Sequence, residues 1–99
     1  ATPLYIACQN GHVDAARLVL EKGAEVDRAN KWGATPLYAA CEKGHVDAAR
    51  VLLDNGAAVD RACVETGWST RTPLSIAKSR AMYSRRHSAV VALLEAHRK

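Results

Sequence analysis

Two pairs of residues have the types and spacing that metal binding or nucleophilic catalysis would use. Cys8 is followed four positions later by His12, and Cys41 is followed at the same distance by His45. A thiolate and an imidazole one helical turn apart could ligate zinc or act as a nucleophile and its base. Zinc needs further convergent ligands, and a nucleophile needs a base held by a third group. Neither arrangement is visible, so we expect no catalytic residue, no metal and no cofactor.

These pairs are copies of each other, because the sequence repeats with a period of 33 residues. Residues 1–33 and 34–66 are identical at 21 of 33 positions. A third, irregular copy restarts at Thr72, 37 residues after Thr35, and about four more residues are inserted in it before Ser88. Such a period is typical of a small unit stacked on its own copies. Since both pairs fall on the repeat motif, we interpret Cys8, Cys41 and their histidines as structural.

Each unit is predicted to contain two helices. Thr35 is suited to cap the first helix, and Pro36 suits its first position. Gly44 is expected to end that helix in the left-handed conformation, and a second helix is predicted over Val46–Asn55, closed by Gly56. Leucine and alanine recur at helical spacing, so each pair of helices has an apolar side that only neighbouring units can cover.

Four segments recur in register: Thr35-Pro36-Leu37-Tyr38-Ala39-Ala40, Gly44-His45-Val46-Asp47, Val51-Leu52-Leu53 and Gly56-Ala57-Ala58-Val59-Asp60. Together they resemble an ankyrin repeat, over nearly all of the chain. The resemblance implies an all-α solenoid of stacked helix-turn-helix units with projecting inter-repeat β-turn fingers. It implies one domain of about three repeats, 1–33, 34–66 and 67–99, and the start within a repeat favours a fragment of a longer array. The family's usual His after Thr-Pro-Leu is replaced by Tyr5, Tyr38 and Ser75, and we expect a structural role for the tyrosines.

Composition and charge narrow the function classes. With 99 residues and 24% charged side chains, the chain is expected to be a single globular domain. It has no apolar run long enough to span a membrane and no signal-peptide pattern, and its odd number of cysteines suits a reducing compartment. We therefore expect an intracellular, cytoplasmic location and no membrane partner. Residues 67–99 carry seven Lys and Arg but only one acidic residue, Glu95.

The resemblance implies a non-enzymatic protein-protein interaction module that binds its partner through the concave face of the first helices and through the fingers. Positions that vary between the repeats should meet the partner, and tryptophan and arginine dominate binding hot spots. The resemblance implies that on the first helices these positions are Gln9, Asn10, Glu42, Lys43, Ser79 and Arg80. On the fingers they are Lys31, Trp32, Ala34, Trp68 and Arg71.

Other interpretations stay open at this point. The basic last repeat could bind nucleic acid or another polyanion, or it could be a charged cap that keeps the stack soluble. A third alternative is an architectural spacer in a longer repeat array. Arg85-Arg86-His87-Ser88 has the arginine spacing that basophilic kinases prefer, so Ser88 is a candidate phosphorylation site and a candidate helix cap. His87 and His97 are expected to be surface histidines, and no small-molecule substrate is indicated.

Overall fold

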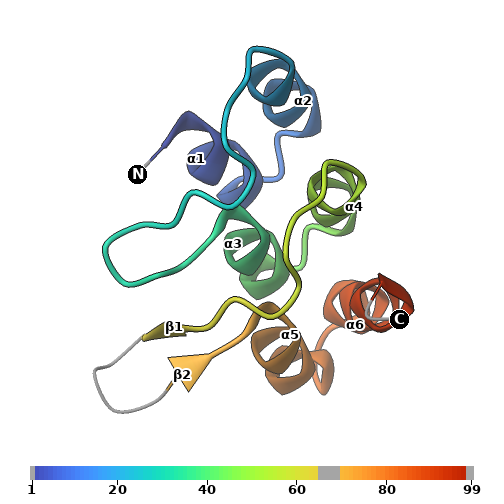
Figure 1. Cartoon of the computed structure of the whole chain (residues 1–99). Coiled ribbons are helices and arrows are strands. Elements are labelled where there is room, and N and C mark those ends of the chain that lie inside the picture. Colours follow the sequence, from blue (N-terminus) through green and yellow to red (C-terminus); the bar gives the residue numbers. More distant parts are fainter. Residues whose placement is uncertain (1, 65–69, 98–99) are drawn as a thin grey trace.

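The computed structural model describes residues 2–64 and 70–97, which form six helices and one short antiparallel strand pair (Figure 1). The helices come in three pairs: α1 (Pro3–Gln9) with α2 (Val13–Glu21), α3 (Pro36–Lys43) with α4 (Val46–Asp54), and α5 (Pro73–Ala81) with α6 (Arg85–His97). Strand β1 (Cys63–Val64) pairs with β2 (Thr70–Arg71).

The three helix pairs stack in two layers. Figure 1 shows α1, α3 and α5 side by side in one layer and α2, α4 and α6 in the other, while the segments between repeats project past the first layer. None of the helices in the described ranges combines the length and apolarity needed to cross a bilayer. The expectation of an all-α solenoid is confirmed. In addition, β1 and β2 form a short β-ladder between the second and third repeats.

The Thr-Pro-Leu motif starts the first helix of every repeat. The Thr35 hydroxyl accepts the backbone N–H of Tyr38 at 3.2 Å, and Thr2 and Thr72 each cap their helix in the same way. In the third repeat Ser75 stands at the position of Tyr38, and its hydroxyl accepts the N–H of Thr72 at 2.8 Å. This reciprocal capping box satisfies two N–H groups that the helix start would otherwise leave free.

Two glycines allow a histidine of the following repeat to pack closely. Gly44 has φ 75°, and a Cβ atom built on it would lie 2.8 Å from the His87 ring. Gly11 stands in the same relation to His45, at 2.7 Å. The His87 side chain is only 8% exposed, and its Nε2 lies 2.8 Å from the backbone carbonyl of Glu42. The expectation that His87 is a surface residue is therefore wrong, because its ring joins the second and third repeats.

Burial depends on neighbouring repeats, as expected for a stack. Ala39 and Val51 in the central repeat are 0% and 5% exposed. Their counterparts in the first repeat, Ile6 and Leu18, are 47% and 55% exposed. The same repeat positions are thus core in the middle of the stack and surface at its α1–α2 end.

The outer face of the opposite end of the stack carries a charged pair. Cys41 is fully buried, whereas Lys78 at the same position of the third repeat is exposed, with its ammonium group 3.8 Å from the Glu95 carboxylate. Because a charged pair replaces a small core residue here, the outer face of α5 and α6 is suited to solvent.

Candidate functional site

The cysteine-histidine pairs do not form a chemical site. Cys8 and Cys41 are fully buried, and burial raises the pKa of each thiol to about 12. His12 and His45 stand at the N-cap positions of α2 and α4, where neither side chain makes a capping hydrogen bond. Across residues 2–64 and 70–97, no three His, Cys, Asp or Glu side chains are grouped to hold a metal ion. The prediction that both cysteines are small core residues is confirmed.

These raised thiol pKa values predict a loss of stability at alkaline pH. In the unfolded chain a cysteine thiol has a pKa of about 8.5, whereas in the fold Cys8 and Cys41 each have a pKa of about 12. Their stabilising contribution is therefore complete below the unfolded pKa and is lost as the pH rises toward the folded value. At about pH 10, we expect each thiol to lower the free energy of unfolding by about 1–2 kcal/mol relative to neutral pH.

Urea titrations at neutral pH and at about pH 10 would measure this effect in the wild type and in the Cys8→Ala/Cys41→Ala variant. The variant should lose less stability than the wild type between the two pH values. Equal losses would show that the two buried thiols do not cause the alkaline destabilisation.

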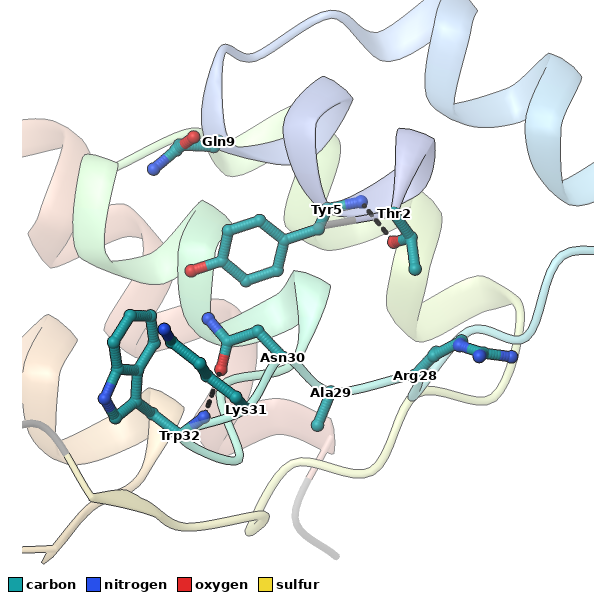
Figure 2. Close-up of a pocket in the computed structure, with 8 residues that line it drawn as sticks. All are labelled: Thr2, Tyr5, Gln9, Arg28, Ala29, Asn30, Lys31 and Trp32. Carbon is teal, nitrogen blue, oxygen red and sulfur yellow. Dashed lines mark hydrogen bonds between the residues drawn. The ribbon is translucent and has the colours of Figure 1, made fainter.

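A groove lies between α1 and the first finger, which we define as residues 28–34. Tyr5 and Gln9 are one turn apart on α1 and lie on the side that meets the finger, so they form one wall (Figure 2). The groove has a volume of about 730 Å³. Its lining residues are Thr2, Tyr5, Gln9, Arg28, Ala29, Asn30, Lys31 and Trp32.

Hydrogen bonds hold the first finger in one conformation. The Asn30 side-chain oxygen accepts the N–H groups of Trp32 at 2.9 Å and Ala34 at 3.0 Å. The backbone of Asn30 donates to the Ala34 carbonyl and accepts from Gly33, whose φ is 84°. The Trp32 carbonyl in turn accepts the N–H of Val64 at 2.9 Å. This last bond connects the first finger to strand β1.

Trp32 presents a large aromatic surface to solvent from this ordered finger. Its side chain is 55% exposed, and the Lys31 ammonium lies 4.5 Å from the centre of the ring. Figure 2 shows the Lys31 side chain alongside the indole, with the Tyr5 ring extending from α1 toward the same end of the groove. This cation-π contact favours one arrangement of the two side chains.

A second hollow of about 220 Å³ continues from Trp32 toward α3. It is lined by Tyr5, Asn30, Trp32, Ala34, Tyr38, Glu42 and Cys63. Glu42 forms an ion pair with Arg80 of the third repeat, with 3.7 Å between the carboxylate oxygen and the guanidinium nitrogen. Burial and then the nearby Glu42 charge raise the pKa of the Tyr5 hydroxyl, so Tyr5 remains a neutral hydrogen-bond donor at physiological pH.

The structure brings part of the expected partner-binding set together. Gln9, Lys31, Trp32 and Glu42 line the two hollows, and Arg80 reaches them through its ion pair with Glu42. Exposed residues at the ends of the first helices, which line neither hollow, are Asn10, Lys43 and Ser79. Arg71 lies in β2 opposite Cys63, and Trp68 lies outside the described residues.

Ala34, also in the expected set, lines the second hollow, but it is only 5% exposed. Its backbone N–H and carbonyl close the turn through Asn30, so the residue also fixes the shape of the finger.

Sequence reasoning missed five residues that line the groove: Thr2, Tyr5, Arg28, Ala29 and Asn30. Asn30 gave a signal, because it opens the stretch in which the first finger differs from the second. Arg28 gave none, since it recurs as Arg61 and so looks like a constant structural position.

Ser88 does not cap the last helix. The cap bond comes from Ser84, whose hydroxyl accepts the N–H of His87 at 3.4 Å. The Ser88 hydroxyl donates to the carbonyl groups of Ala81 and Ser84, each at 3.3 Å, within the first turn of α6. Its phosphorylation stays a prediction.

Comparison with known proteins agrees with this architecture. The family model for ankyrin repeats (3 copies) matches residues 1–63 and 28–98. In solved structures 370 chains match, and one is the ankyrin repeat domain of human ASB11, with 28% sequence identity and a TM-score of 0.82. That match covers 99% of this chain and 40% of the ASB11 chain. A comparison with curated protein sequences gave no significant match.

Proposed function

The chain belongs to the ankyrin-repeat family, and from that premise we propose that it is a non-enzymatic module that binds a protein partner through its first-helix face and first finger. Ankyrin repeats generally mediate protein-protein interaction. The two hollows beside Trp32 supply a concave surface with an aromatic anchor, and we place the partner there.

One observation carries this proposal: the exposed Trp32 ring on a finger whose backbone is fixed by hydrogen bonds. Tryptophan is enriched among binding hot spots because it buries a large area with few rotatable bonds. Asn30 and Val64 hold the Trp32 backbone, and Lys31 lies over the ring. Little ordering is therefore left for the partner to impose, which favours tight binding.

Substituting Trp32 with alanine should weaken partner binding by about 10–100-fold, since hot-spot truncations cost about 2 kcal/mol or more. We would immobilise the full chain, expose it to a lysate of its source cells and quantify captured proteins by mass spectrometry. A true partner should be retained by the wild type and largely lost with Trp32→Ala.

Leu18→Ala is the matched control for this experiment. Leu18 is as exposed as Trp32, at 55%, but it lies on α2 away from both hollows. Truncation should leave capture of the same proteins unchanged. If Leu18→Ala abolished capture and Trp32→Ala did not, the partner would bind elsewhere on the molecule and the proposed surface would be wrong.

A further inference from the structure

The groove beside the first finger is lined by hydrogen-bond donors and cations. The guanidinium of Arg28 comes from the start of the finger and the ammonium of Lys31 from its middle (Figure 2). Tyr5 contributes a neutral hydroxyl, because its pKa is raised by burial and by Glu42. Asn30 uses its side-chain oxygen within the finger, which leaves its NH₂ group as the polar atom with free hydrogen-bonding capacity toward the groove.

Two carboxylates close to the groove, those of Glu42 and Asp27, are already engaged. The groove lining contains no Asp or Glu. In the adjoining hollow, Glu42 pairs with Arg80 at 3.7 Å. Asp27, the sequence neighbour of Arg28, directs its carboxylate oxygens at the N–H of Ala58, at 3.1 and 3.2 Å. The positive charge of Lys31 is therefore available to a partner, and Arg28 adds a second cation although Glu25 lines the neighbouring hollow with it.

We infer that the partner contributes an acidic peptide segment, in which an Asp or Glu side chain lies next to an apolar residue. The carboxylate would meet Lys31 or Arg28, and the apolar side chain would pack on Trp32 and Tyr5. Arginine and lysine bind carboxylates through charge-assisted hydrogen bonds, and the aromatic surface supplies the apolar contact. This inference rests on the proposed function and adds the chemistry of the partner to it.

An acidic peptide fits this surface better than a nucleic acid does. Residues 1–66, which contain the groove, carry seven Lys and Arg against nine Asp and Glu. A polyanion would thus meet a surface with no net positive field, whereas nucleic-acid binding depends on an extended basic surface. In the third repeat, two of the described cations, Lys78 and Arg80, are paired with Glu95 and Glu42. Arg28 and Lys31 are two cations near the Trp32 indole, and this number matches a partner segment that has one or two carboxylates.

The test is a selection of random dodecapeptides displayed on phage against the immobilised full chain. Selected peptides should be enriched in Asp or Glu adjacent to an aromatic or aliphatic residue. Their affinity should fall about tenfold or more for Arg28→Glu/Lys31→Glu, since opposite charges become like charges. The control Lys22→Glu/Arg85→Glu has the same net charge but changes exposed residues outside both hollows, and it should bind as the wild type does.

Each other outcome has a distinct meaning. Peptides without acidic residues that still lose affinity with Trp32→Ala would overturn the acidic partner and leave the proposed function standing. Failure to select any peptide, or selection of peptides indifferent to Trp32→Ala, would overturn both. If a fluorescein-labelled single-stranded deoxythymidine dodecamer bound as tightly as the peptides and lost affinity with the same charge reversal, the partner class would be a nucleic acid.

Discussion

Replacing Gly44 with alanine is expected to lower the free energy of unfolding by about 3–5 kcal/mol. Forcing a residue with a Cβ into the left-handed conformation costs about 1–2 kcal/mol, and Gly44 has φ 75°. The new methyl group would also lie 2.8 Å from the His87 ring. Displacing that ring removes its 2.8 Å hydrogen bond to the Glu42 carbonyl and disturbs a packed seam, together about 2–3 kcal/mol.

Gly56→Ala separates the two parts of this effect. Gly56 has φ 86°, but no described neighbouring atom lies within 4 Å of the position that its Cβ would take. Its substitution should therefore show only the backbone term, about 1–2 kcal/mol. Denaturant titrations of both variants would measure the difference. Equal losses would show that the contact with His87 does not stabilise the seam.

Leu52→Ala is expected to lower the free energy of unfolding by about 3–4 kcal/mol. Leu52 lies on α4 in the central repeat and is completely buried. Truncation of a buried leucine removes apolar contacts and leaves a cavity, with losses of about 2–5 kcal/mol. A stack of three repeats has little stability in reserve, so we expect a clear shift of the urea midpoint.

Leu93 gives the control, because it is a leucine of the last helix that packs against the core but is only partly buried. Leu93→Ala should cost about 1–2 kcal/mol, in proportion to the smaller area that it removes from contact. A loss as large as that of Leu52→Ala would mean that the central repeat does not carry most of the stability.

The sequence was sufficient to predict the helices of the second repeat, because their ends depend on local chemistry. Thr35 and Pro36 started α3 where expected, and Gly44 ended it in the left-handed conformation. The second helix ended at Asp54, one residue before its predicted end at Asn55. Local hydrogen bonding decides such boundaries, so they can be predicted without tertiary structure.

His87 shows what local reasoning cannot supply. Its place in the sequence follows an insertion, so it has no counterpart in the 33-residue register. In the fold its ring takes the place against Gly44 that His45 takes against Gly11. The contact between a histidine ring and a glycine is thus kept in the third repeat, although the histidine lies at a different sequence spacing. Only the packing between the repeats reveals this.

The groove was predictable only in part, for a similar reason. Variation between repeats pointed to Lys31 and Trp32, which do line it. Arg28 and Thr2 are constant between the first two repeats, and they line the groove because of where the first finger folds. Ala34 varies in the third repeat but is buried, since its backbone closes the Asn30 turn. Sequence variation therefore does not by itself distinguish residues that fix the conformation of the finger from residues that are exposed in the groove.

The two ends of the stack differ in a way that gives the molecule a direction. Ile6 and Leu18 leave an apolar end at α1 and α2, whereas the pair of Lys78 and Glu95 closes the end at α5 and α6. A further helix pair added at the first end would bury apolar surface, but at the second it would have to desolvate charge. The stack is therefore directional: packing another apolar surface against it is more favourable at the α1–α2 end than at the α5–α6 end.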